Sequence, residues 1–356
     1  MTENLLKSVR RLNAEWEPVE AVLVAIPSYE AESDWNYIYS EMIAQYYRLL
    51  EAFTSNNVSV VIVSDNPDFI SPFFKELNNG LLRYVSLPIN DTWTRDYGPL
   101  CIDLENRKML LDFGFNGWGL KFAADKDNLV NLNLCKREII SNESYINYRD
   151  FVLEGGSIET DGEGTLLTTT SCLCSPNRNG GKTIDELNPI LTEKLGVDRI
   201  LWLSHGHLEG DDTDSHIDTL ARLCPNNTII YTGCEDMNDT HYDSLLKMKE
   251  EIMAIKNKNG ESFHLLELPL PNPILDPVDG HRLPATYTNY LIVNDIVFVP
   301  VYLQKSKDDK ACGVIRDAFP NHKIVPVDCT TFIRQHGSLH CATMQIHNNC
   351  FNFKRL

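Results

Sequence analysis

Residues 153–169 read LEGGSIETDGEGTLLTT, which is a short apolar segment, a polar glycine-rich turn and a second apolar segment. This pattern predicts a β-hairpin with strands at 157–160 and 165–169. The same form occurs three more times, at residues 100–113, 219–232 and 289–300, and a final apolar stretch follows at 342–346. The chain is therefore expected to be strand-rich and built from repeated units.

The residues just before these segments recur at a nearly constant interval. They are 58, 62, 71 and 54 positions apart, at Asp96, Glu154, His216, Tyr287 and Cys341. Apolar residues with helical spacing lie between the hairpins, at 35–54, 184–195 and 241–255. Modules of about 60 residues cannot bury their own apolar faces and must pack around an axis or in a row.

We therefore expect an α/β fold in which five modules form a closed ring, as a single domain over residues 1–356. The alternative is an ordinary α/β protein whose short hairpins only resemble a repeat.

Charge and composition limit the partners. The 356 residues include 50 acidic and 32 basic side chains, for a net charge of −18 at pH 7. An acidic surface repels phosphate, so nucleic acid and anionic membranes are poor partners and a small cation is a better one. The longest apolar runs, 21–26, 58–63 and 296–303, fall far short of the roughly 20 residues that span a bilayer and predict buried strands.

Two further features predict a cytoplasmic protein. Residues 1–11 lack the apolar core of a signal peptide. The 10 cysteines are too sparse for a disulfide scaffold, and we interpret them as reduced thiols.

Four of the residues that open modules could carry chemistry: Asp96, Glu154, His216 and Cys341. In a ring these positions converge, and a thiol, an imidazole and carboxylates together suit thiolate attack on a substrate held by acids. Asp218 adds a carboxylate, because side chains two positions apart on a strand share a face. Each residue alone is also explained as a turn residue, a loop acid, a hydrogen-bonded histidine or a buried apolar side chain. The joint pattern favours a catalytic site.

The acidic run at 209–218 does not fit a metal-binding motif. In an EF-hand register from Asp212, Ile217 replaces the required Gly and Leu223 replaces the bidentate Glu. Cys172 and Cys174 lack a second pair at zinc-site spacing. The sequence therefore predicts no metal site.

Five motifs resemble those of the agmatine deiminase family, also called the bacterial peptidyl-arginine deiminase-like family. They are WTRDYGP at 93–99, LEGGSIETDGEGTLLTT at 153–169, PNRN at 176–179, HID at 216–218 and HC at 340–341. The likeness begins near EWEP at 15–18 and runs in order along nearly the whole chain. This resemblance implies the pentein fold, a five-bladed, pseudo-fivefold α/β propeller of guanidine-modifying enzymes.

The resemblance also implies a covalent mechanism on a small cationic guanidine, with no metal or organic cofactor. Asp96 and Asp218 match the carboxylates that hold the planar guanidinium. Cys341 matches the nucleophile and His216 the acid–base group. Glu154 matches the acid that orients the imidazole and helps to hold the substrate.

Residues farther along the substrate decide its identity. Trp93 is expected to form an apolar wall for the methylenes. Asp212 matches the acid that faces the far amine in the agmatine enzymes, although DTDSH at 212–216 departs from the usual ETNGH by a shorter acid, an extra acid at Asp214 and Ser215 in place of Gly. An acidic tail site would repel the carboxylate of free arginine. The first expectation is therefore agmatine, hydrolysed to N-carbamoylputrescine and ammonia.

Alternatives to this expectation are a deiminase for peptidyl-arginine or another guanidine, a metal-assisted amidase, and a ring that binds without chemistry. A homo-oligomer is compatible with the sequence.

Overall fold

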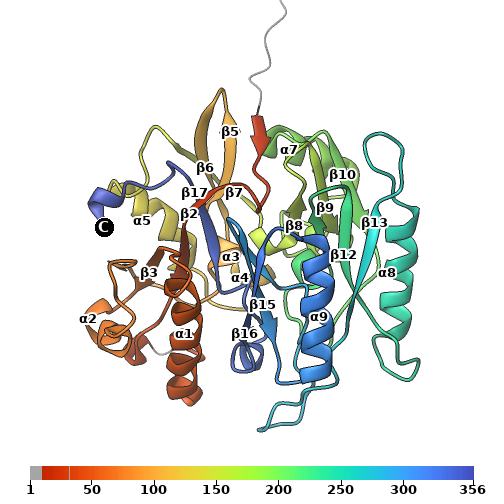
Figure 1. Ribbon diagram of the computed structural model, residues 1–356. Helices are drawn as coiled ribbons and strands as arrows, with labels where there is room; N and C mark the ends of the chain where they lie inside the picture. Colours follow the sequence, from red (N-terminus) through yellow and green to blue (C-terminus); the bar gives the residue numbers. More distant parts are fainter. Residues whose placement is uncertain (1–9, 32) are drawn as a thin grey trace, which may run out of the picture.

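The computed structural model describes residues 10–31 and 33–356, and its fold is mixed α/β (Figure 1). Most of the segment searched for a signal peptide, residues 1–9, lies outside the described residues. No helix in the two described ranges combines the length and the apolar character needed to cross a membrane.

The described strands form five separate sheets with one shared connection pattern. In each sheet an antiparallel pair is joined by a third strand that runs parallel to one member of the pair. In sheet order the strands are β1 (Arg10–Leu12), β5 (Leu100–Leu104), β6 (Arg107–Gly114) and β7 (Tyr145–Val152); β10 (Arg199–Leu203), β9 (Thr165–Thr169) and β8 (Ile158–Thr160); β11 (Ala221–Cys224), β12 (Thr228–Gly233) and β13 (His264–Pro269); β14 (Leu291–Val293), β15 (Ile296–Val301) and β16 (Lys323–Asp328); and β17 (Met344–His347), β2 (Val19–Ala25), β3 (Val60–Ser64) and β4 (Leu82–Ser86).

The two ends of the chain meet in the last of these sheets. Strand β17 pairs antiparallel with β2, so that Met344 lies opposite Leu23. One of the five strand pairs is thus assembled from segments more than 300 residues apart in sequence, and this pairing holds β17, the last described strand, beside β2.

All four predicted hairpins are confirmed, but the third and the fourth each begin two residues later than expected. Residues Ile217–Thr219 form a single 3-10 turn, η6, and β11 starts only at Ala221. The Thr219 hydroxyl donates to the carbonyl of His216 at 2.8 Å and stabilises this turn. The expectation that His216 and Asp218 share one face of an extended strand is therefore wrong.

The three predicted helices are also present, as α1 (Tyr39–Thr54), α7 (Ile184–Leu195) and α8 (Tyr242–Ala254). Helix α9 (Lys305–Ala318) was not predicted, because only Ala311, Ile315 and Ala318 are buried along its length. Figure 1 shows α1, α8 and α9 outside the strands. The shorter helices are α2 (Pro67–Ile70), α3 (Thr94–Tyr97), α4 (Gly117–Leu120), α5 (Val130–Lys136) and α6 (Thr170–Leu173).

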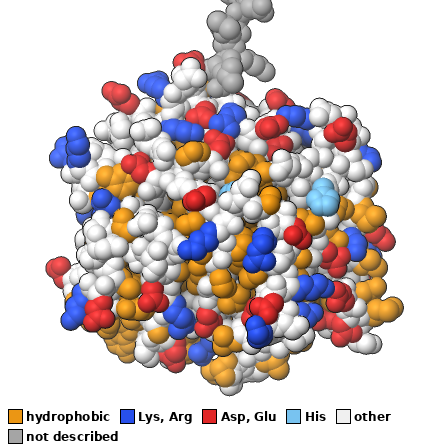
Figure 2. Space-filling view, viewed as in Figure 1, with side chains coloured by type: hydrophobic (Ala, Val, Ile, Leu, Met, Phe, Trp, Pro, Cys, Tyr) orange, Lys and Arg blue, Asp and Glu red, His pale blue; other side chains and the backbone are white. Residues whose placement is uncertain are grey.

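The apolar runs of the sequence form the core. Strands β2, β3 and β15 are almost entirely buried, as their unbroken apolar sequences predict. Figure 2 shows acidic and basic side chains scattered over one face of the molecule with small hydrophobic areas between them. Rigid strands thus support the turns that precede them, where the candidate site lies.

Candidate active site

Turns that lead into the first strands of the strand pairs bring the predicted residues together. Asp96 lies in α3 before β5, Glu154 precedes β8, His216 and Asp218 precede β11, and Cys341 precedes β17. All five side chains are buried, and the most exposed of them, Cys341, is only 7% accessible. Charged groups at this depth must be paired or neutral.

Gly156 marks the point where three of these side chains meet. A Cβ atom at this position would lie 2.8 Å from both Asp96 Oδ1 and His216 Nδ1. It would also lie 3.1 Å from Asp218 Oδ2. The absence of a side chain at Gly156 therefore allows the two aspartates and the histidine to converge.

The side chain that the fourth module contributes to the site is Asn289, and not the expected Tyr287. Its amide nitrogen donates to Asp218 Oδ2 and lies 3.2 Å from Cys341 Sγ. The hydroxyl of Tyr287 instead donates to Asp308 at 2.7 Å, away from these groups. The interval of the repeat was thus correct to within two residues, but the contributing side chain was missed.

Asp96 has only uncharged hydrogen-bond donors. Trp118 Nε1 donates to Oδ2 at 2.9 Å, and the Gly156 backbone N–H donates to Oδ1 at 3.0 Å. Burial raises the pKa of Asp96 well above its usual value, and the nearby charges of Asp218 and Glu154 add to this effect. The surroundings of Asp96 therefore favour its protonated form until a cation approaches.

Asp218 is in the opposite state. His340 Nδ1 lies 2.7 Å from its Oδ2, and Oδ1 has no hydrogen-bond partner. Burial opposes ionisation of Asp218, but the hydrogen bond and charge of His340 lower its pKa below the usual value. The surroundings thus favour the protonated form of Asp96 and the ionised form of Asp218.

The thiol and the imidazole are both uncharged. Burial, together with the charges of Asp218 and Asp96, raises the pKa of Cys341 well above that of a free thiol. Burial lowers the pKa of His216 to about 3, and neither of its ring nitrogens has a hydrogen-bond partner. A neutral imidazole with a free nitrogen can accept a proton from a thiol or from water.

Glu154 contacts an arginine more closely than the histidine that it was expected to orient. Both of its oxygens lie 2.9 Å from Arg178 Nε, whereas Oε2 is 3.9 Å from His216 Nε2. Burial raises the pKa of Glu154, and the Arg178 charge opposes this shift. The expected orienting hydrogen bond is therefore not formed in this structure.

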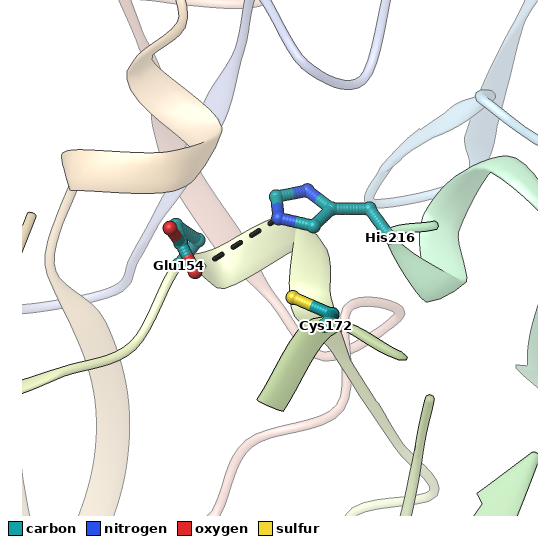
Figure 3. A group of neighbouring side chains, drawn as sticks. All are labelled: Glu154, Cys172 and His216. Atoms are coloured by element: carbon teal, nitrogen blue, oxygen red, sulfur yellow. Dashed lines mark ion pairs between the residues drawn. The ribbon is translucent and has the colours of Figure 1, made fainter. Parts of the chain in front are cut away.

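Cys172 completes a compact group with Glu154 and His216 (Figure 3). One ligand atom from each lies within 4.8 Å of the other two, and sulfur, nitrogen and oxygen are ligands that Zn²⁺ accepts. Arg178 holds both Glu154 oxygens, so a metal ion would compete with it. The expectation that the protein needs no metal or cofactor stays a prediction.

A cleft of about 470 Å³, including space open to solvent, leads to Cys341. Among the described residues that line it there is no lysine or arginine, but there are five aspartates: Asp34, Asp91, Asp96, Asp211 and Asp212. Trp93, Trp118 and Phe122 supply aromatic surface. A cleft with this lining suits a cation that carries an apolar chain.

The two acids of the DTDSH segment have different surroundings. Asp212 lines the cleft, and burial raises its pKa to about 6 against the influence of His336. Asp214 pairs instead with Lys121 at 2.7 Å and with Arg178 at 2.5 Å. The extra acid is thus engaged in the loop, and Asp212 remains the member of the pair that faces the cleft.

Comparison with known proteins agrees with this geometry. The family model for Porphyromonas-type peptidyl-arginine deiminase matches residues 11–346. The chain belongs to this family. Agmatine deiminase from Pseudomonas aeruginosa (strain UCBPP-PA14) is a relative of 32% identity, over 94% of this chain and 95% of the relative. The deiminase family therefore spans nearly the whole described structure.

Two solved structures of deiminases are similar throughout. A Cys-to-Ser variant of C. jejuni agmatine deiminase with substrate bound has a TM-score of 0.87 and 36% identity, covering 97% of this chain and 98% of that chain. Agmatine deiminase of Enterococcus faecalis has a TM-score of 0.82 and 26% identity, covering 97% and 99%. The mixed α/β fold is thus that of these deiminases.

Three groups that contact the site were not identified from the sequence of this deiminase family member. Trp118, Arg178 and Asn289 all hydrogen-bond a predicted site residue. Arg178 could have been found, because it belongs to the PNRN motif at 176–179. Trp118 lies in a segment that carried no signal of its own, and Asn289 opens the fourth predicted hairpin, where it was assigned to a strand and not to the site.

Proposed function

We propose that this protein is an agmatine deiminase, a hydrolase that converts agmatine and water to N-carbamoylputrescine and ammonia. The observation that carries the proposal is the cleft, which combines five aspartates, aromatic surface and Cys341, with no lysine or arginine among its described lining residues. Agmatine has a cation at each end and an apolar chain between them, and therefore complements this lining. The relatives named agmatine deiminase support the same substrate.

The proposed chemistry begins with binding of the guanidinium between Asp96 and Asp218. Its positive charge favours ionisation of both Asp96 and the Cys341 thiol, which burial otherwise opposes. His216 accepts the thiol proton, and the sulfur adds to the central guanidinium carbon. His216 then passes this proton to the departing nitrogen, so that ammonia leaves and an amidino-thioether remains on Cys341.

In the second half, water attacks the carbon of this intermediate. His216 takes one proton from the water, the carbon–sulfur bond breaks, and that proton returns to the thiolate of Cys341. The second proton of the water leaves the ureido oxygen for solvent. The ureido product leaves and the site is restored. Glu154 is proposed to bind the substrate and His216, Trp93 to contact the methylenes, and Asp212 to bind the distal ammonium.

We further propose that residues 1–356 form one catalytic domain of five modules arranged as a five-bladed propeller. Support comes from the five sheets with one connection pattern and from the pairing of β17 with β2. The cytoplasmic location and a homo-oligomer stay predictions.

Peptidyl-arginine is the second candidate substrate, favoured by the name of the family model. Parallel assays of agmatine, arginine and an arginyl peptide for ureido product test both candidates. Selective turnover of agmatine supports the first proposal, whereas preference for the peptide overturns it. Iodoacetamide inactivation that agmatine protects against, together with insensitivity to chelators, would separate the thiol enzyme from a metal-assisted amidase and from a binding protein.

A further inference from the structure

Two hydrogen bonds link Asp218 to Glu15 through His340; the one to Asp218 is buried and the one to Glu15 is partly buried. His340 Nδ1 lies 2.7 Å from Asp218 Oδ2, and its Nε2 lies 2.7 Å from Glu15 Oε1. His340 is 1% exposed and Asp218 is fully buried. Because each ring nitrogen faces a carboxylate oxygen, both nitrogens must carry a proton to satisfy the two contacts.

Glu15 is itself held by cations. Arg222 Nη2 donates to its Oε2 at 2.6 Å and Arg95 Nη1 to its Oε1 at 3.0 Å, and the Gln345 amide also donates to Oε2. Burial opposes ionisation of Glu15, but the charges of Arg95, His340 and Arg222 lower its pKa well below the usual value. Glu15 therefore remains an anion and can keep a cation at His340.

We propose that Glu15 is a positioning residue that holds His340 as a doubly protonated imidazolium, which in turn fixes Asp218 as a carboxylate directed at the substrate. This inference deepens the proposed function, since it rests on Asp218 as a guanidinium ligand. It assigns a task to Glu15 and His340, neither of which touches the reacting atoms in the proposed mechanism.

The contacts of Asp218 show how the imidazolium would position it. His340 binds Oδ2 and leaves Oδ1 without a partner, although Asp218 is fully buried. A buried carboxylate oxygen without a partner is costly, and a guanidinium N–H would satisfy it. The His340 backbone N–H also donates to Asn289 Oδ1 at 2.9 Å, so the histidine that orients Asp218 is itself fixed beside Cys341.

Asp96 provides the internal contrast. Its donors are the neutral Trp118 ring and the Gly156 backbone, and burial raises its pKa. Asp218 is at least as deeply buried, yet its pKa is lowered. The difference between the two aspartates lies chiefly in the His340 contact, to which the charge of Arg222 adds, and the imidazolium depends on the Glu15 charge.

The first test measures His340 directly and needs no substrate. Protein labelled with ¹⁵N-histidine is studied by NMR at neutral pH, and the His340 ring signals are assigned by their loss in His340→Gln. Two protonated ring nitrogens in the wild type, and loss of one of them in Glu15→Gln, are expected. A singly protonated His340 in the wild type would overturn the proposal, and this spectrum decides even if Glu15→Gln fails to fold.

The second test is kinetic, with Glu17→Gln as the matched control. Glu17 lies two residues away and binds Arg11 and Asn13 rather than His340. Glu15→Gln is expected to lower kcat/KM roughly 10- to 100-fold, as is typical when a carboxylate that orients a histidine is removed, while Glu17→Gln stays within about twofold of the wild type.

The pH profile separates positioning from a general structural defect. Without the imidazolium, Asp218 becomes harder to ionise, so the loss in Glu15→Gln should be largest at acidic pH and shrink as pH rises. A loss of equal size at every pH, or an equal loss in the control, would overturn the positioning role. Failure of the wild type to process any guanidine would instead contradict the proposed function and leave the NMR result to decide the state of His340.

Discussion

Trp118 Nε1 donates a hydrogen bond to Asp96 Oδ2 at 2.9 Å and so joins the turn at α4 to the candidate site. This turn has a left-handed backbone at Trp118 (φ 53°) and Gly119 (φ 82°), and the Asn116 side chain accepts from the Gly119 N–H. A non-glycine residue in this conformation is uncommon and is maintained by its surroundings. The indole thereby both lines the cleft and satisfies one aspartate oxygen.

Trp118→Phe should lower kcat/KM for agmatine by about 3- to 10-fold, because it removes one hydrogen bond worth about 0.5–1.5 kcal/mol and keeps an aromatic ring. Trp202→Phe is the control, since the Trp202 indole binds Asn188 and is absent from the cleft lining. Steady-state kinetics of both variants measure the effect. An unchanged kcat/KM in Trp118→Phe would show that the Asp96 contact is irrelevant to turnover.

Cys341→Ser should abolish turnover while the protein folds and still binds substrate, because a hydroxyl is far less acidic than a thiol. Product formation and thermal unfolding are measured side by side. Loss of a covalent nucleophile costs several orders of magnitude, so residual activity above about one hundredth of wild type would refute the assignment. A covalent adduct mapped by mass spectrometry to Cys172 rather than Cys341 would refute it equally.

Binding of agmatine should release about one proton from Asp96, because its raised pKa keeps it protonated and the guanidinium requires the anion. Since proton release favours binding at higher pH, affinity should rise as pH rises toward the pKa of Asp96. Calorimetry of Cys341→Ser in two buffers with different protonation enthalpies measures this proton without turnover. Asp96→Asn should bind more weakly and lose the buffer dependence; a buffer-independent enthalpy in Cys341→Ser itself would contradict the neutral state of Asp96.

The sequence predicted the elements that local pattern specifies and missed those that depend on packing. Hairpin strands such as β8 and β9 follow from apolar alternation and glycine-rich turns, whereas α9 is mostly charged and buries few residues. At the site, Cys341 and His216 were identifiable because few other roles combine a thiol with an imidazole. Asn289 was not, because an isolated asparagine before a strand resembles any turn residue.

Ion pairs between residues far apart in the sequence were likewise outside the reach of sequence patterns. Arg178 contacts Glu154 from 24 positions away, and Glu15 reaches His340 from 325 positions away. Only the three-dimensional arrangement reveals which acid meets which base, and the contact of His340 with Asp218 favours the ionised form of Asp218 while burial favours the protonated form of Asp96.

Gly156→Ala should inactivate the enzyme, because its methyl group would approach Asp96 Oδ1 and His216 Nδ1 to 2.8 Å and occupy the space where these groups converge. Kinetics and thermal unfolding are compared with Gly313→Ala in α9, where a Cβ would meet no atom within 4 Å. The control should retain activity and gain slightly in stability. Normal kcat/KM in Gly156→Ala would mean that substrate does not enter the space bounded by these three side chains.

Asp212→Asn should raise KM for agmatine much more than it lowers kcat, because an acid that binds a remote ammonium stabilises ground state and transition state alike. The expected loss for a charge-assisted hydrogen bond is about 1.5–3 kcal/mol, or roughly 10- to 150-fold in kcat/KM. Because the pKa of Asp212 is raised to about 6, the wild-type KM should also increase as pH falls below this value and the carboxylate is neutralised.

Butylguanidine, which lacks the amine, separates recognition from chemistry: Asp212→Asn should hardly change its slow turnover. Asp211→Asn is the contrasting variant, since Asp211 accepts from the Thr213 hydroxyl and the Ser215 backbone N–H and supports the loop. Asp211→Asn should impair turnover of both substrates.

If Asp212→Asn also impaired turnover of both substrates equally, Asp212 would be acting on the loop or on His216. Asp34 or Asp91 on the same cleft would then have to bind the amine. If it impaired neither, a peptide or another guanidine would become the favoured substrate.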